Sequence, residues 1–194
     1  MAKTEVKADI LEQPITRGGI TWEQFIHIQQ AFADIPGIRL TYCEGVLEIM
    51  PLSKPHEFIC HLLGILLGLY FIHKRIRFFP SGAYSQIIQG VTEYQSDLSY
   101  SFDHDKDVPD LCIEVIITSS RMDKLRKYQL RGVPEVWFWQ DGKITVYSLV
   151  EGNYELQDKS ELLPDLDLVF LCECLHQDDP LQASLQFQTR ISSG

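Results

Sequence analysis

Three acidic side chains lie in segments that otherwise have the pattern of β-strands. Glu48 interrupts the apolar run VLEIM, Asp97 begins the alternating stretch DLSYSF, and Glu114 lies at the centre of LCIEVII. An isolated carboxylate in an apolar interior costs several kcal/mol unless it is paired with a cation or bound to a metal. These residues therefore indicate either a divalent-metal site or a set of buried ion pairs.

Asp97 and Glu114 are the candidate metal ligands, provided that their strands are neighbours. Mg²⁺ takes one or two protein carboxylates and keeps several waters, which leaves places for phosphate oxygens. Lys124 comes one turn into the helix after Glu114, where it could stabilise negative charge on a phosphate under attack or favour hydroxide formation from bound water. Lys127 and Arg131 fall on the same helix face and are candidate contacts to a phosphate backbone.

The alternative interpretation is purely structural. Glu48 and Glu114 would be buried ion pairs with partners such as Lys124 or Arg126, and Asp97 would be an exposed strand residue. Buried pairs occur without any function, and a basic helix face is often simply solvated. Composition alone leaves both interpretations open.

The early elements are indicated by end signals and periodicity. TWEQ is a capping box and predicts a helix over residues 21–35. The runs IRLTY and GVLEIM predict a hairpin that carries Glu48. The apolar run that follows predicts a buried helix over residues 56–75, and residues 77–102 have the pattern of two or three strands, the last of which alternates cleanly between apolar and polar residues.

The later elements would place the acids beside the basic residues. Residues 110–117 predict a strand that is buried on both faces, with Glu114 on the same face as Cys112. SRMD is a second capping box and opens a helix to about residue 131, which Gly132 ends. VPEVWFWQ and KITVYSLV flank the strongest hairpin signal, DG. LLPDLDLVFLCECL predicts a short strand and a helix.

The order of elements predicts an α/β or α+β mixed class, with helices early, between strands and late around a mixed sheet. The length fits one domain, over residues 19–177. Residues 1–18 form an N-terminal extension and residues 178–194 a C-terminal tail, and both lack periodicity and are expected to be loose ends.

Charge and composition restrict the partners and the compartment. The net charge is −10, but residues 151–180 alone carry −8, whereas Arg121 to Arg131 carry +4. Charge alone therefore neither supports nor excludes DNA binding. Five cysteines without a CxxC pair are expected to be reduced core residues of a cytoplasmic protein. The longest apolar stretch, FICHLLGILLGLYFI, is shorter than the about 20 residues that a membrane span needs, so no membrane partner is expected.

Two other metal motifs fail on their spacing. HEFICH has histidines at i and i+5, about 140° apart on a helix, whereas the zinc-protease motif needs i and i+4. DHDKDVPDLCIE has acids at positions 1, 3, 5 and 12 of a calcium loop but lacks the glycine at position 6. His56, at the expected start of its helix, remains a candidate neighbour of the active site.

The sequence resembles the Uma2 family, also called DUF820, over about residues 20–176. The resemblance is carried by LTYCEGVLEIMPLSKPHE, by PDLCIEVIITSS with RMDKLRKYQLRGVPEVWFWQDGKITVYSL, and by LLPDLDL. It implies a restriction-endonuclease-like PD-(D/E)XK fold, with a central mixed β-sheet flanked by helices. It also implies that Asp97 and Glu114 bind the metal, that Glu48 assists, and that Lys124 is the catalytic lysine.

Two positions depart from what the resemblance implies. The usual lysine position of the fold, two residues after the glutamate, holds Ile116. The resemblance implies that the lysine comes instead from the next helix, which Lys124 fits. Gln95-Ser96-Asp97 stands where relatives commonly have Glu-Pro-Asp.

Taken together, the acids, the basic helix and the resemblance predict a DNA endonuclease dependent on Mg²⁺ or Mn²⁺, with homodimerisation expected from the resemblance. The alternative is a catalytically inactive nuclease-like scaffold that acts as a binding or assembly module.

Overall fold

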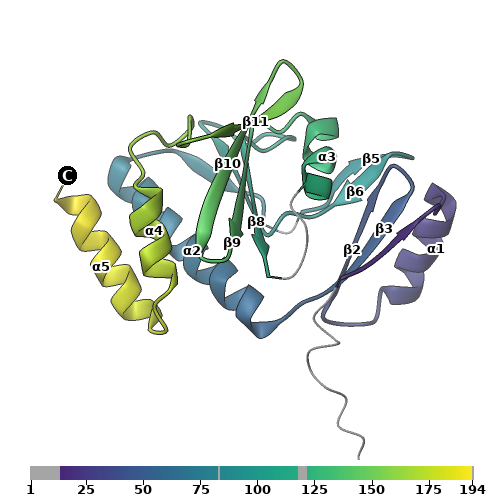
Figure 1. Cartoon of the computed structure of the whole chain (residues 1–194), viewed down its shortest axis with the longest axis horizontal. Helices are drawn as coiled ribbons and strands as arrows, with labels where there is room; N and C mark the ends of the chain where they lie inside the picture. Colours follow the sequence, from purple (N-terminus) through teal and green to yellow (C-terminus); the bar gives the residue numbers. More distant parts are fainter. Residues whose placement is uncertain (1–13, 83, 118–121, 194) are drawn as a thin grey trace, which may run out of the picture.

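The chain folds into two β-sheets and five helices, seen in a computed structural model that describes residues 14–82, 84–117 and 122–193 (Figure 1). The first sheet is antiparallel, in the order β1-β3-β2-β6-β5. Its strands are β1 (Ile15–Gly18), β2 (Ile38–Cys43), β3 (Val46–Pro51), β5 (Gln86–Ile88) and β6 (Thr92–Tyr94). Helix α1 (Trp22–Phe32) packs on this sheet through Phe25, against Tyr42 and Leu47.

The second sheet is mixed and has the order β11-β10-β9-β8-β7-β4. Its strands are β4 (Phe78–Pro80), β7 (Leu98–Phe102), β8 (Leu111–Ile116), β9 (Glu135–Gln140), β10 (Lys143–Val150) and β11 (Asn153–Gln157). All neighbours are antiparallel except β8 and β9, which are parallel and are joined through α3 (Met122–Arg131). The predicted mixed α/β class is therefore confirmed, while the separate five-stranded sheet was not foreseen.

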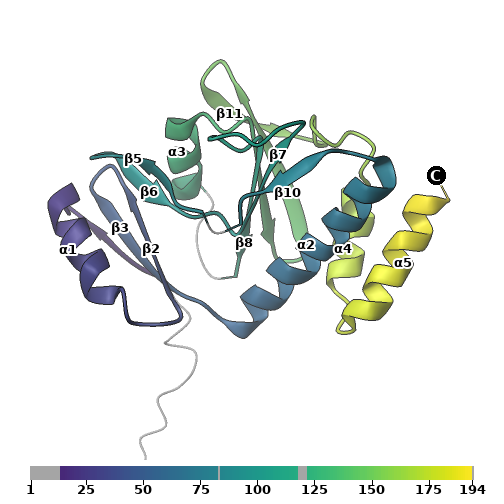
Figure 2. The same ribbon diagram turned by 180° about the vertical axis from the view of Figure 1, so that it is seen from behind.

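Helices cover both faces of the mixed sheet. Helix α2 (Lys54–Lys74), with α4 (Leu168–Leu175) and α5 (Pro180–Ser192), lies on one face, and α3 lies on the other, towards the first sheet (Figure 2). Strand β8 is buried on both faces, because Leu111, Ile113 and Val115 pack under α2 while Cys112 and Ile116 pack under α3. This strand is therefore the centre of the fold.

Helix α2 is held by its ends and by its leucines. Ser53 caps its N-terminus, and Arg75 ends it in the left-handed conformation with φ of 56°. Leu62, Leu63, Leu66 and Leu67 are all buried. Among the described residues, one helix, α2, is long and apolar enough to cross a membrane. Length and composition alone are weak evidence for a membrane span, because buried core helices of soluble proteins have the same properties.

Most of the predicted elements are observed. The first capping box, the hairpin that carries Glu48, the doubly buried strand with Glu114 and the end of α3 at Gly132 are confirmed. Asp141 and Gly142, both with positive φ, form the two-residue turn between β9 and β10. The second capping box lies at residues 120–123, partly outside the described residues.

Several expectations were wrong. Residues 77–102 form four short strands rather than two or three, and residues 162–167 form turns rather than a strand. The C-terminal residues are not loose, because α5 buries Ala183 and Phe187, which are four residues apart and hence on one helix face. Asp179 caps this helix, and Pro180 begins it. Such a short amphipathic pattern in a polar segment is easily missed.

Candidate active site

Asp97 and Glu114 are cross-strand neighbours. Strands β7 and β8 pair with Leu98 opposite Ile113, and one further step of this register brings Asp97 opposite Glu114. Asp97 itself precedes the first residue of β7, and its side chain contacts Arg39 and His56, whereas that of Glu114 contacts Lys127 and Tyr128. The amide of Val115 donates to Oδ2 of Asp97 across 2.7 Å, which ties the acid to the other strand. The two acids therefore belong to neighbouring segments of the fold, and the convergence of their carboxylates on one ion stays a prediction.

The Asp97 carboxylate is buried and has cationic partners on two sides. Arg39 from β2 donates to Oδ1, and Nε2 of His56 lies 3.1 Å from Oδ2. Burial alone would raise the pKa of Asp97, but the hydrogen bond from His56 and the charge of Arg39 outweigh it and lower the pKa to about 2. Asp97 is therefore ionised at neutral pH. Its side chain is buried, so it is not the exposed strand residue that the structural alternative expected.

Glu114 is buried beneath α3, and its two oxygens have different surroundings. Oε1 accepts hydrogen bonds from Nζ of Lys127 across 2.7 Å and from the hydroxyl of Tyr128. Oε2 faces Nζ of Lys124 at 3.9 Å, beyond hydrogen-bond distance. In the described part of the chain, Oε2 is thus the less occupied of the two oxygens. This is the atom that an incoming cation would meet.

Lys124 lies between two carboxylates. Its Nζ is 3.8 Å from Oε1 of Glu48 and 3.9 Å from Oε2 of Glu114, and only 5% of the residue is exposed. Burial lowers the pKa of this ammonium group, but the charges of Glu114, Glu48 and Asp97 outweigh burial and raise it. Lys124 is therefore a fixed cation at neutral pH, in contact with the candidate metal ligands.

The two other predicted basic contacts have different surroundings. Lys127 is not on a solvated helix face, because it is 4% exposed and its Nζ lies between the rings of Tyr94 and Tyr128, about 5 Å from each centroid. Arg131 is partly exposed, and its Nε donates to Gln86 across 3.0 Å. Lys127 is thus a structural partner of Glu114, whereas Arg131 borders the surface.

His56 begins the buried face of α2, with Cys60 one turn later. Its Nδ1 lies 3.1 Å from Glu57 and its Nε2 contacts Asp97, so carboxylates accept at both ring nitrogens. Burial lowers the pKa of His56, but Asp97 outweighs this effect and raises it. By contrast, the side chain of His61 is 82% exposed, which agrees with the rejection of a shared His56–His61 metal site.

Sequence reasoning missed Arg39, Cys60 and Tyr128. Arg39 and Tyr128 are ordinary residues of an amphipathic strand and helix, and only the packing of β2 and α3 against β7 and β8 brings them to the acids. The signal for Cys60 was available, since four residues separate it from His56 on one helix.

The carboxylates fit a hard divalent cation. Asp97, Glu114 and Glu48 supply oxygen donors, which Mg²⁺ and Mn²⁺ prefer. Four basic groups face these acids, and they are Arg39, Lys124, Lys127 and His56, the last of which lies between Asp97 and Glu57. With Glu57 counted, four acids and four basic groups can balance one another without an ion. The donor set therefore allows a metal, but the electrostatics of the cluster do not require one.

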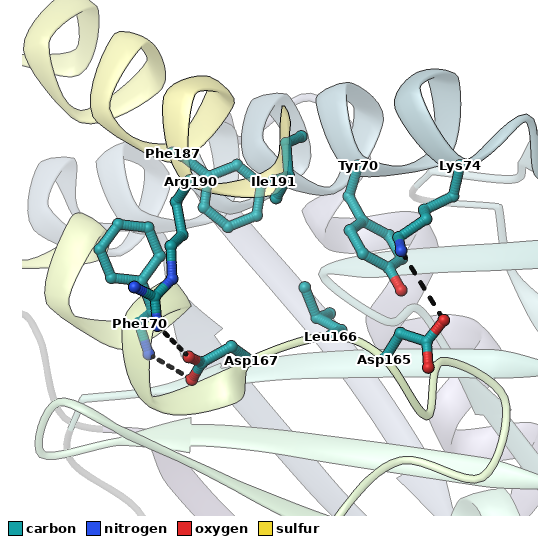
Figure 3. A pocket seen from close by; sticks show the side chains of 9 residues that line it. All are labelled: Tyr70, Lys74, Asp165, Leu166, Asp167, Phe170, Phe187, Arg190 and Ile191. Atoms are coloured by element: carbon teal, nitrogen blue, oxygen red, sulfur yellow. Dashed lines mark hydrogen bonds and ion pairs between the residues drawn. The ribbon is translucent and has the colours of Figure 1, made fainter. Parts of the chain in front are cut away.

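A separate cavity of about 420 Å³ lies between α2, the turn before α4, and α5 (Figure 3). Its charged side chains are paired with one another, Lys74 with Asp165 at 3.7 Å and Arg190 with Asp167 at 3.6 Å. None of the three candidate acids, Glu48, Asp97 and Glu114, lines this cavity. It is therefore not the place where the predicted chemistry would occur.

Comparison with known proteins relates the chain to nucleases. The model of the Uma2 family, described as "Putative restriction endonuclease", matches residues 22–181. Among solved structures, the chain is similar to one from Anabaena variabilis ATCC 29413, described as "a putative nuclease belonging to DUF820". The identity is 16% and the TM-score 0.49, over 87% of this chain and 99% of that chain. Comparison with curated proteins gives no match.

Proposed function

Because the chain belongs to the Uma2 family, we propose that it is a metal-dependent endonuclease that hydrolyses phosphodiester bonds in DNA. One observation carries this proposal. The ammonium group of Lys124 lies 3.8 and 3.9 Å from the carboxylates of Glu48 and Glu114, at the end of β8 where Asp97 also lies. Glu48 comes from β3 of the first sheet and Glu114 from β8 of the second, and acids that meet at a lysine in this way form a constellation suited to phosphoryl chemistry.

Asp97 and Glu114 would hold the ion, and Glu48 would assist. A bound Mg²⁺ or Mn²⁺ would supply Lewis-acid activation of a water and of the scissile phosphate. Lys124 would offer positive charge to the pentavalent transition state, because in the described part of the chain its ammonium group lies near both acids but beyond hydrogen-bond distance from each.

Other residues would act through the acids. Arg39 and His56 hold the Asp97 carboxylate from two sides and fix its orientation. Lys127 and Tyr128 do the same for Oε1 of Glu114, which leaves Oε2 to face the ion and the substrate. Arg131 would contact a DNA phosphate from the rim. A homodimer remains part of the proposal, and a single 22.4 kDa species in gel filtration would contradict it.

A catalytically inactive binding module is the second candidate, and the charge balance favours it. Each acid of the cluster already has a basic neighbour, so the buried charges are compensated as in a structural network. This candidate predicts no measurable Mn²⁺ binding at the cluster. The two functions therefore differ in a quantity that can be measured without any substrate.

The test combines metal binding with cleavage. Purified protein is freed of metal with EDTA, titrated with Mn²⁺ by calorimetry, and incubated with plasmid and single-stranded DNA with and without Mn²⁺. We expect binding and cleavage, both lost in Asp97→Asn and Glu114→Gln. The matched control is Glu44→Gln, an exposed acid whose partner is Arg126. Cleavage that persists in Glu114→Gln, or that does not need a divalent ion, overturns the proposal.

A further inference from the structure

A second donor set lies beside the acids, and it contains sulfur. His56 and Cys60 are one turn apart on α2, about 40° around the helix axis, so both side chains point the same way. Together with Asp97 they bring a ring nitrogen, a thiol sulfur and a carboxylate oxygen within 4.8 Å of one another. His56 and Cys60 are 5% and 6% exposed, and the Asp97 side chain is fully buried.

The donor atoms of these three residues are close enough to meet on one ion after side-chain rotation. Nε2 of His56 lies 3.1 Å from Oδ2 of Asp97, and Sγ of Cys60 lies 3.6 Å from Nδ1 and 3.8 Å from Nε2 of His56. Zinc–sulfur, zinc–nitrogen and zinc–oxygen bonds of about 2.3, 2.0 and 2.1 Å at tetrahedral angles put sulfur about 3.5 Å and oxygen about 3.4 Å from the nitrogen. Since Sγ is nearly equidistant from both ring nitrogens, it lies over the face of the ring, and the Cys60 or His56 side chain would rotate to bring Sγ into a coordination shell at Nε2.

The outer contacts of the cluster are those of a metal-binding histidine. A ligating histidine usually donates its other ring N–H to a carboxylate, which fixes the ring. Here Nδ1 of His56 lies 3.1 Å from Oε1 of Glu57. Asp97 is also held in place, because Arg39 donates to Oδ1 and the amide of Val115 donates to Oδ2 across 2.7 Å, while Oδ2 also lies 3.1 Å from Nε2 of His56.

We propose that His56, Cys60 and Asp97 form a binding site for a thiophilic divalent cation of the Zn²⁺ class, with one coordination position left for water. The site is distinct in chemistry from the oxygen cluster around Lys124, because a thiolate ligand selects zinc over Mg²⁺. The two sites share Asp97 and would compete for it. Zinc binding itself does not depend on the chain being a nuclease.

The experiment uses Co²⁺ as a spectroscopic probe on the reduced, full-length protein. Thiolate ligation gives a sulfur-to-cobalt charge-transfer absorption in the near ultraviolet, which oxygen ligands do not give. We expect this band to saturate at one Co²⁺ per chain, to disappear on addition of Zn²⁺, and to resist excess Mg²⁺. Absence of the band in the wild-type protein overturns the proposal, whether or not the protein cleaves DNA.

Variants identify the ligands. Cys60→Ala and His56→Ala should abolish the band, and Glu57→Gln should weaken zinc binding about 10-fold. The matched control is Cys172→Ala, because Cys172 is a helical cysteine of similar exposure, 8%, and His176 one turn later is turned to the Cys172 carbonyl at 2.7 Å. A band that persists in Cys60→Ala, or that is lost only in Cys172→Ala, contradicts the assignment. If Cys60→Ala does not fold by circular dichroism, the isosteric Cys60→Ser replaces it in this comparison.

Discussion

Lys127 donates to Glu114 across 2.7 Å, with both side chains buried between β8, α3 and the ring of Tyr94. Helical spacing had grouped Lys127 with Lys124 and Arg131 as a phosphate-binding face. The structure separates these three lysine and arginine residues, because Lys127 neutralises a core carboxylate while Lys124 stays beyond hydrogen-bond distance from the same residue. The two lysines therefore have different expected effects on stability and on activity.

Lys127→Ala is expected to destabilise the protein by about 3–5 kcal/mol, because it leaves Glu114 buried without its closest cation. Chemical denaturation followed by circular dichroism measures the free energy of unfolding. Arg126→Ala serves as the control, since Arg126 is on the same helix but its pair with Glu44 is exposed. Equal losses in the two variants would contradict a structural role for Lys127.

Lys124→Met is expected to lower metal-dependent DNA cleavage by about 10²–10³-fold, the usual cost of losing one group that stabilises a transition-state charge. Methionine keeps most of the unbranched lysine side chain, is one atom shorter, and removes its charge. The turnover number under saturating DNA and Mn²⁺ is the quantity to compare, with Mn²⁺ affinity measured separately. A variant that binds Mn²⁺ and cleaves at the wild-type rate would remove Lys124 from the mechanism.

His56 predicts a pH-dependent contribution to the stability of the metal-free protein. Its pKa is raised in the folded state above the ordinary 6.5, since the bond to Asp97 outweighs burial. This contribution is fully present below pH 6.5 and is lost as the pH rises through the folded-state pKa. The free energy of unfolding of the wild type minus that of His56→Gln, measured in EDTA, should therefore decrease from pH 6 upwards. A difference independent of pH would show that His56 is neutral.

Zn²⁺ is expected to inhibit Mn²⁺-dependent cleavage, because both ions need Asp97. In Cys60→Ala the zinc concentration for half inhibition should rise at least about 10-fold, in line with the loss of one ligand. Each variant is compared with its own zinc-free rate. Inhibition of equal sensitivity in both proteins would place the inhibitory zinc elsewhere.

The C-terminal helix should contribute to stability. Phe187→Ala is expected to cost about 3–5 kcal/mol, because Phe187 is 1% exposed in the main core. Leu185→Ala, at a position 49% exposed on the same helix, should change stability by less than about 0.5 kcal/mol. Similar values for the two variants would mean that α5 does not stay docked in solution.

The acids of the site could be predicted from the sequence because a charge in an apolar strand breaks a strong pattern. Glu114 in LCIEVII is the clearest case. The pattern alone is not diagnostic, however. Glu135 in EVWFW is equally buried, but it accepts from neutral donors, Trp137, Ser160 and the amide of residue 161, and has a purely structural environment. Which donors reach a buried acid is decided by tertiary packing.

The rest of the site depends on contacts between distant segments. Arg39 reaches Asp97 across 58 residues of sequence, and no local periodicity encodes that approach. Likewise, the helix face of Lys127 could be assigned, but not its depth, because the rings of Tyr94 and Tyr128 that cover it come from two different elements. Local sequence patterns predicted most of the strands, whereas long-range packing decides which basic and aromatic side chains contact the acids.

The neutrality of the cluster around Lys124 and Lys127 has a consequence for how the protein matures. In a zinc finger, the polypeptide stays unfolded until its ion arrives. Here the basic side chains already lie against the acids, so we expect the chain to reach its native state without an ion, and the proposed metal would bind reversibly to the folded protein.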